Sequence, residues 1–306
     1  MPGQRSPGRC VPGHGPAPRC SPGRRPRPPA RLAARCACCL RLKRCPDVRL
    51  RAPWGGPPDS PGSKACPSAA CRQDASSDCH RARFPDNGAM PPWPDIDTVL
   101  LDMDGTLIDL HFDNTLWNQH LPALFAAVHA IKVEEARERL YGHMRDAPPS
   151  LDFYSLDYWA TYTGMDIDAL HAELDHLIVY RPGASPFMAA VRASGRRAVL
   201  VTNAHPKSLA VKDGKIGLRG QLDADFSSHD FGMPKEDPAF WPALAEREVH
   251  DPARTLLIDD NPAVLHAARG AGIRHLMCVT RPDSRKPHRA DLGFPAFDHF
   301  EEIAPP

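Results

Sequence analysis

From residue 90 onward, the sequence predicts an α/β fold with a doubly wound parallel sheet, helices on both faces and a helical segment inserted after the first strand. Two observations support this prediction. Short apolar runs alternate with stretches of helical spacing that have recognisable ends, and this alternation is typical of parallel sheets with helical crossovers. The 217 residues from Met90 onward are also enough to bury a core of this kind.

Four short apolar runs are predicted to be strands, because parallel strands that are buried on both faces have no polar alternation. Residues that directly follow such strands meet at the carboxyl edge of the sheet, where folds of this class bind ligands. The four runs are Thr98 to Leu101, Arg197 to Val201, Thr255 to Ile258 and His275 to Val279.

Helix-end signals predict helices between these strands. Proline is favoured at the first position of a helix, Asp and Asn are favoured as its cap, and glycine is favoured just after its end. The predicted helices are Pro186 to Ser194 before Gly195, one that starts at Asp237 and Pro238, and one from Asn261 and Pro262 to about Arg269 and Gly270.

The stretch from Asp113 to Tyr180 interrupts the alternation, because its pattern is helical almost throughout. Apolar side chains such as Trp117 and Leu121 recur at helical spacing, and two more helical stretches follow at 134–144 and 156–163. We expect residues 113–180 to form a helical cap over the carboxyl edge of the sheet. Residues 90–112 and 181–306 are then expected to form the core.

Residues 1–89 differ in kind from the rest of the chain. They hold 16 prolines and carry 17 Lys and Arg against 5 Asp, a net charge of +12, whereas the remainder has a net charge of −11. With no apolar periodicity, this segment is predicted to be disordered. Three interpretations remain open: a basic targeting or nucleic-acid-binding tail, a cysteine-rich metal module, and a stretch translated from a start codon placed too early.

Cysteine use favours a reduced, cytoplasmic protein. Nine of the ten cysteines precede Met90, without the paired spacing of a zinc module, and only Cys278 follows it. No apolar run approaches the roughly 20 residues that span a bilayer, and nothing resembles a signal peptide. A membrane is therefore not expected as a partner.

An aspartate pair follows the first predicted strand, in Asp102-Met103-Asp104-Gly105-Thr106. Side chains alternate along an extended chain, so the two carboxylates flank one small volume at the sheet edge. Carboxylates beside a glycine turn suit Mg²⁺ and phosphate. The alternative is an ordinary turn, because Asp-Gly is a common turn pair.

Three further motifs lie at strand ends or helix starts. Thr202 and Asn203 end the second strand and have polar groups for phosphate oxygens. Lys235 precedes a predicted helix and has the charge to neutralise a phosphoryl group. Asp259 and Asp260 follow the third strand, and adjacent carboxylates repel each other unless a cation or a proton separates them. Each motif alone also has a structural explanation as a cap or a solvated side chain.

Taken together and in this order, the four motifs resemble the haloacid dehalogenase superfamily of phosphohydrolases over about residues 96–282. The resemblance implies a Rossmann-like core with a helical cap. It also implies that Asp102 is the nucleophile that forms an aspartyl phosphate and that Asp104 is the general acid and base. Thr202, Asn203 and Lys235 would hold the phosphoryl group. Mg²⁺ would bind Asp102, the backbone carbonyl of Asp104 and Asp260, with Asp259 either coordinating the ion or ordering its waters.

A narrower set of motifs is similar to the bacterial GMP/IMP nucleotidase group. These motifs are Asp97 to Leu107, Leu110 to Asn114, Leu156 to Trp159, Thr202 to Pro206 and Phe231 to Asp237. The resemblance implies a purine 5′-nucleotidase that takes a small phosphate ester as substrate, with no nucleic-acid partner. The sequence carries no signal for an oligomeric state.

Two other functions remain open at this point. One is a sugar-phosphate phosphatase or phosphomutase, because specificity resides in the cap. The other is a catalytically idle binding module with a basic tail. A dehalogenase is disfavoured, since Asp104 supplies a second carboxylate that can protonate a leaving alcohol.

Overall fold

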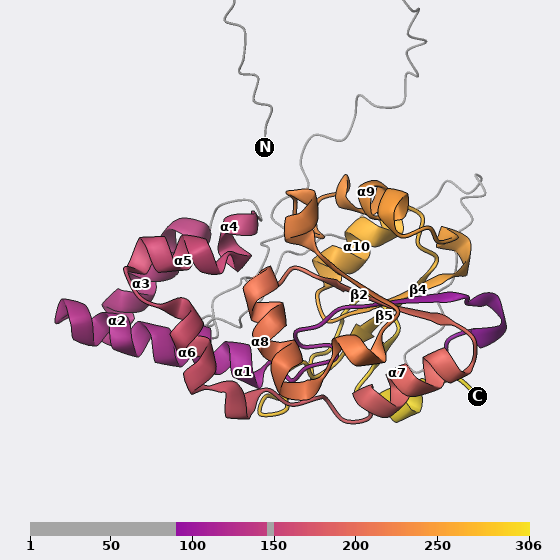
Figure 1. The fold of residues 1–306 in the computed structure, drawn as a ribbon, viewed down its shortest axis with the longest axis horizontal. Coiled ribbons are helices and arrows are strands. Elements are labelled where there is room, and N and C mark those ends of the chain that lie inside the picture. The colour runs from indigo at the N-terminus through magenta and orange to yellow at the C-terminus, as the bar shows by residue number, and fades with distance from the viewer. Residues whose placement is uncertain (1–89, 146–149) are drawn as a thin grey trace, which may run out of the picture. The chain divides into compact units, whose positions relative to one another are not determined.

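A computed structural model describes residues 90–145 and 150–306, so the predictions for residues 1–89 lie outside the described part. The described residues form a six-stranded, wholly parallel sheet in the order β3-β2-β1-β4-β5-β6 (Figure 1). The predicted fold class is therefore confirmed. The strands are β1 (Thr98–Leu101), β2 (Arg197–Thr202), β3 (Ala224–Ser227), β4 (Thr255–Asp259), β5 (His275–Val279) and β6 (Ala296–Phe297).

The four predicted strands are all present, and β2 and β4 each extend one residue further than predicted. The two added residues, Thr202 and Asp259, are candidate site residues. They therefore lie in the strands themselves and not in the loops that follow. β3 and β6 were not predicted. β3 begins with two half-buried residues and β6 has only two residues, so neither has the continuous apolar run of an interior strand.

Each face of the sheet buries alternate strand residues under a pair of helices. Helices α7 (Ala184–Ala193) and α8 (Pro206–Ile216) share a core with Leu101 and Leu200. Helices α9 (Phe240–Arg247) and α10 (Pro262–Gly270) cover the opposite face, where Leu100 and Val201 point. This two-sided burial explains why the strands are apolar throughout.

The predicted helix ends are correct in part. Asn261 caps α10 as expected, with its side chain accepting a hydrogen bond from the Ala263 amide. The helix predicted to begin at Asp237 and Pro238 instead begins at Phe240, so that prediction is wrong. Asp237 accepts hydrogen bonds from the amides of Ala239 and Phe240, which keeps this stretch a turn. In addition, α7 begins two residues earlier than predicted.

The insert between β1 and β2 is helical, as predicted, although its first helix begins at His111 instead of Asp113. Its two ends are joined by backbone hydrogen bonds, from Asp109 N to Val179 O at 3.0 Å and from Arg181 N to Leu107 O at 2.9 Å. Figure 1 shows its longer helices gathered beside the sheet. Its elements are α1 (His111–Thr115), a π-helical turn (Leu116–His120), α2 (Leu121–His129), α3 (Val133–Arg145), α4 (Leu151–Tyr154), α5 (Leu156–Thr163), α6 (Ile167–Glu173) and a 3₁₀ turn (Asp175–Leu177).

Within residues 90–145 and 150–306, no helix has both the length and the apolar character needed to cross a membrane.

Candidate active site

Asp102 lies at the carboxyl end of β1, a central strand that pairs with β2 on one side and with β4 on the other. Its amide donates to Ile258 O at 3.0 Å, and Thr106 Oγ1 donates to Asp102 Oδ2 at 3.1 Å. Gly105 turns the loop with a φ of +82°, and a Cβ there would come within 2.9 Å of Asp260 Cγ. Only glycine therefore allows the two acidic loops to approach each other this closely.

Lys235 is buried between two of the predicted site carboxylates. Its Nζ donates to Asp102 Oδ1 at 2.6 Å, to Asp259 Oδ2 at 2.7 Å and to Val201 O at 3.1 Å. The side chain is only 2% exposed. Burial alone would lower the pKa of Lys235, but the carboxylates of Asp102 and Asp259 outweigh it and raise that pKa. Lys235 is therefore a fixed positive charge in the floor of the site.

Asp102, Asp259 and Asp260 form a group of convergent carboxylates. One oxygen from each lies within 4.8 Å of the others. Burial, together with the neighbouring negative charges, raises the pKa of Asp260 to about 7 and that of Asp259 well above its usual range. Three hard oxygen ligands that repel one another in a buried site fit a divalent cation such as Mg²⁺. The Asp104 carboxylate lies outside this group.

Arg289 supports the same loop from the other side. Its Nη2 donates to Asp260 O at 2.6 Å and to Val279 O at 2.7 Å, while Nη1 lies 3.8 Å from Asp260 Oδ2. Arg289 thus binds the backbone carbonyl of Asp260 and places a positive charge near its carboxylate. No sequence motif pointed to this residue.

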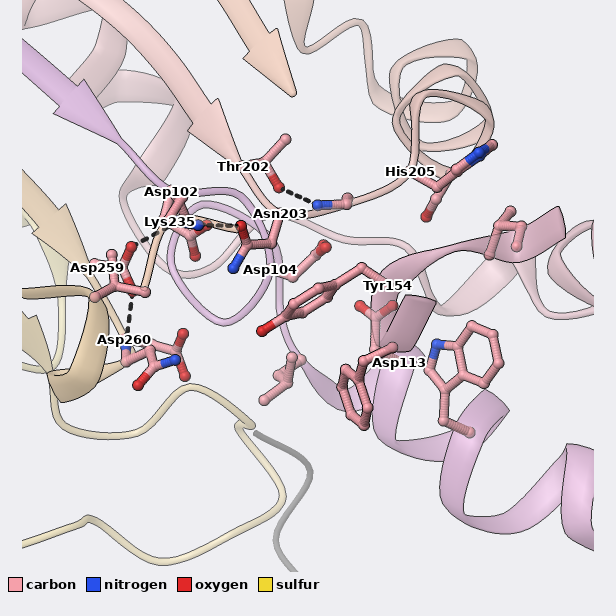
Figure 2. Close-up of a pocket in the computed structure, with 18 residues that line it drawn as sticks. Asp102, Asp104, Asp113, Tyr154, Thr202, Asn203, His205, Lys235, Asp259 and Asp260 are labelled. Atoms are coloured by element: carbon pink, nitrogen blue, oxygen red, sulfur yellow. Dashed lines mark hydrogen bonds and ion pairs between the residues drawn. The ribbon is translucent and has the colours of Figure 1, made fainter. Parts of the chain in front are cut away.

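Thr202 and Asn203 lie beside Asp102 at the end of β2, as predicted (Figure 2). Thr202 Oγ1 accepts from the Ala204 amide at 3.0 Å, which leaves its own hydroxyl proton for another acceptor. Asn203 Oδ1 accepts from the Lys235 amide at 2.9 Å, and its Nδ2 donates to Glu236 Oε2 at 2.9 Å. Asn203 thereby fixes the Lys235 loop to the sheet edge.

Asp104 belongs to a second charged cluster, which was not predicted from the sequence. Lys212 Nζ, from α8, donates to Asp104 Oδ1 at 2.6 Å and to both carboxylate oxygens of Asp113 at 2.9 Å. Burial, with the negative charge of Asp113, raises the pKa of Asp104 to about 7 despite the lysine. Near neutral pH, the Asp104 carboxyl group can therefore be either protonated or ionised.

A pocket lies over these groups, between the edge of the sheet and the insert (Figure 2). The insert supplies an aromatic and aliphatic wall, in which the Tyr154 hydroxyl donates to Glu236 Oε1 at 3.0 Å. The residues of the insert that line the pocket are Leu110, Trp117, Phe153, Tyr154 and Leu156, together with the carboxylate of Asp113.

The aromatic side chains of the insert fall into two groups, those that line the pocket and those that pack inside the insert. Phe153 lines the pocket. Trp159 is 1% exposed and its ring packs against those of Trp117 and Tyr158, so it holds the helices of the insert together. Trp117 and Tyr154 line the pocket and were missed, because helical spacing alone does not distinguish a packed ring from a lining one.

All the predicted site residues therefore gather at one edge of the sheet, although in two clusters. Lys212 gave no sequence signal, because a single lysine in a helix usually lies on the surface. Asp113 lies within the segment from Leu110 to Asn114, in which no residue was assigned a role from the sequence. Only their contact in the folded structure identifies Lys212 and Asp113 as a pair, because they are 99 residues apart in the chain.

Comparison with known proteins agrees with this geometry. Residues 96–272 match the haloacid dehalogenase-like hydrolase family. The chain is 42% identical over 213 residues to the GMP/IMP nucleotidases YrfG of Escherichia coli (strain K12) and Shigella flexneri, covering 70% of this chain and 96% of each relative. The crystal structure of a HAD phosphatase from Thermococcus onnurineus has a TM-score of 0.56 at 20% identity, covering 68% of this chain and 95% of that one.

The family match spans more than half of the chain, and the two nucleotidases are matched over nearly their whole length. The resemblance inferred from the four motifs is thereby confirmed. The chain is a phosphohydrolase that belongs to the haloacid dehalogenase-like hydrolase family.

Proposed function

We propose that the chain is a magnesium-dependent purine 5′-nucleotidase that hydrolyses GMP and IMP through an aspartyl phosphate on Asp102. The observation that carries the chemistry is the convergence of Asp102, Lys235 and the Asp259–Asp260 pair at the end of the central strand. The similarity to two GMP/IMP nucleotidases supports the substrate class.

In the first step, a carboxylate oxygen of Asp102 attacks the phosphorus atom and the bond from phosphorus to the nucleoside oxygen breaks. The Asp104 carboxyl gives its proton to that departing oxygen. Thr202 and Asn203 orient the phosphoryl oxygens, and the Lys235 ammonium offsets their charge. This role for Lys235 is supported by its burial, because a charge in a dry site acts strongly on its neighbours.

In the second step, the Asp104 carboxylate takes a proton from water, which attacks the phosphorus of the aspartyl phosphate and restores Asp102. One group serves as acid and then as base, so its pKa has to lie near the working pH. A pKa of about 7 for Asp104 supports this assignment.

Asp102, Asp259, Asp260 and the backbone carbonyl of Asp104 are the proposed ligands of Mg²⁺. When bound, the cation supplies charge that offsets the repulsion between the carboxylates and the phosphate dianion.

We further propose that residues 113–180 act as a cap on a catalytic core formed by residues 90–112 and 181–306. The paired backbone at the two ends of the insert, and the aromatic wall that the insert contributes to the pocket, support this division. Phe153, Tyr154 and Trp117 offer flat apolar surfaces for a purine. A reducing cytoplasm suits the buried free thiol of Cys278.

The test is a phosphate-release assay with added Mg²⁺ that compares GMP, IMP, AMP and a hexose phosphate at equal concentration. We expect GMP and IMP to give the highest kcat/KM. A purine site that donates to the 6-oxo group would disfavour AMP, because an unpaired buried polar group costs about 1–3 kcal/mol. Fastest turnover of the sugar phosphate would contradict the nucleotidase assignment, and fastest turnover of AMP would contradict the preference for GMP and IMP. The phosphatase mechanism would stand in both cases.

A further inference from the structure

Lys212 is a buried cation that the mechanism above does not use. It lies on α8, its side chain is 0% exposed, and its Nζ has three carboxylate acceptors within 2.9 Å. An ammonium group has three hydrogen-bond donors, and here each of them has a protein acceptor. Lys212 is therefore not available to bind substrate.

The two partners of Lys212 come from different parts of the fold. Asp104 lies in the loop after β1, whereas Asp113 lies in α1, the first helix of the insert. The Phe112 ring packs against the ammonium at 5.1 Å. Because both the lysine and Asp113 are on helices, the acceptor on Asp104 is held by rigid elements rather than by a mobile loop.

The contact also distinguishes the two oxygens of Asp104. Lys212 donates to Oδ1 at 2.6 Å. A cationic donor favours the unprotonated oxygen of a carboxyl, so the transferable proton is favoured on Oδ2. Asp113 accepts the two remaining ammonium hydrogens and keeps Nζ in place.

We propose that Lys212, held by Asp113, is a positioning residue that orients Asp104 to protonate the leaving group through Oδ2. In that step the proton on Oδ2 passes to the nucleoside oxygen as its bond to phosphorus breaks and the bond from Asp102 to phosphorus forms. The inference rests on the proposed function, because it assigns a role within the first step of that reaction.

The leaving group provides the test. A nucleoside oxygen departs as a strong base and needs a proton, whereas 4-nitrophenolate is weakly basic and departs without one. We would measure release of the alcohol in the first turnover from GMP and from 4-nitrophenyl phosphate. For Lys212→Met, we expect the rate with GMP to fall about 10²–10³-fold, and the rate with the aryl ester to fall less than about tenfold.

Lys215→Met is the matched control. Lys215 lies on the same helix and also reaches the insert, through a pair with Asp175 at 3.1 Å, but both side chains are substantially exposed. We expect this variant to keep the wild-type ratio of the two rates. A changed ratio would show that any link between α8 and the insert affects the leaving group, which would contradict a specific role for Lys212.

The double variant Lys212→Met/Asp113→Leu provides a second test in case Lys212→Met does not fold, because it removes the buried cation together with a buried anion. It should show the same selective loss as Lys212→Met. An equal loss with both esters, or no loss with either, in a folded variant would overturn the inference.

Failure of the proposed function gives a different result. If the wild-type enzyme releases 4-nitrophenolate but not guanosine, the nucleotidase assignment fails, and the same ratio is then measured with whichever alkyl phosphate the enzyme hydrolyses. If the wild-type enzyme hydrolyses neither class of ester, both the proposed function and this inference are wrong.

Discussion

Lys235 and Lys212 are both fully buried lysines held between two aspartates, yet they join different parts of the molecule. Lys235 connects Asp102 with Asp259, which both lie at strand ends of the sheet. Lys212 connects Asp104 with Asp113 and so joins the loop after β1 to the insert. In the proposed mechanism this difference separates two tasks: the first cluster offsets the charge of the phosphoryl group, and the second orients the acid that protonates the leaving group.

The largest expected effect is at Asp102, the proposed nucleophile. Asp102→Asn should lower turnover by at least about 10⁴-fold, because the amide keeps the shape but lacks the attacking charge. Lys235 keeps Asp259 as a partner, so the fold should persist. Phosphate release and thermal midpoint are the measurements. Turnover near wild type in the folded variant would overturn the covalent mechanism.

Metal removal probes the cluster of Asp102, Asp259 and Asp260. Chelation should lower activity by about 10³-fold, and Mg²⁺ should restore it. Because a ligand that binds only the folded state stabilises it, Mg²⁺ at about 100 times its Kd should add about 2.7 kcal/mol to the free energy of unfolding. Asp260→Asn should weaken this stabilisation sharply. Full activity after exhaustive chelation would be incompatible with a metal site.

Lys235→Met tests most directly whether Lys235 and Lys212 have different roles. The rate should fall about 10²-fold or more with GMP and with 4-nitrophenyl phosphate alike, because the charge acts on the phosphoryl group rather than on the leaving group. The free energy of unfolding should drop by about 3–5 kcal/mol, since two buried carboxylates lose their partner. A loss confined to GMP would assign this lysine the role proposed for Lys212.

A smaller effect is expected beside the second cluster, at His171 in α6. Its ring contacts Phe112 and Trp117, and its Nδ1 donates to Ile167 O at 2.9 Å. Burial lowers the pKa of His171 to about 4. As the pH falls from about 6.5 toward 4, the His171 side chain takes up a proton in the unfolded chain but not in the folded chain. This difference lowers the free energy of unfolding by about 1.4 kcal/mol per pH unit.

The measurement for His171 is the free energy of unfolding between pH 4 and pH 7, for the wild type and for His171→Leu. The carboxylates titrate in both proteins, so the difference between the two curves gives the contribution of the His171 imidazole alone. We expect the wild type to lose stability relative to the variant as the pH falls. Parallel curves would mean that His171 titrates normally.

The smallest effect concerns residues 1–89, because both lysine clusters lie after Met90. A chain that begins at Met90 should keep the turnover and the thermal midpoint of the full-length protein. Both lengths would be measured under the same conditions. A large drop in either quantity would show that the N-terminal segment belongs to the enzyme.

Much of the fold was readable from sequence because buried parallel strands and helix caps leave local signals. The four interior runs and the Asn261 cap were predicted correctly. The start at Asp237 was wrong, because a side chain that caps a helix also closes a turn, and local preference does not decide between them. The edge strands β3 and β6 were missed because β3 begins with two half-buried residues and β6 has only two residues, so neither has a continuous apolar run.

By itself, the sequence determined the sheet class and the family. It also identified the aspartates and the threonine at strand ends, because the carboxyl ends of parallel strands necessarily converge, and Lys235 through its place in the order of the four motifs. Only the tertiary structure decided which charges share a partner. Lys212 and Asp104 are 108 residues apart, and their pairing depends on how α8 packs against the start of the insert. Neither local periodicity nor strand-end position reports that contact, because burial of a charge is decided by packing between distant elements.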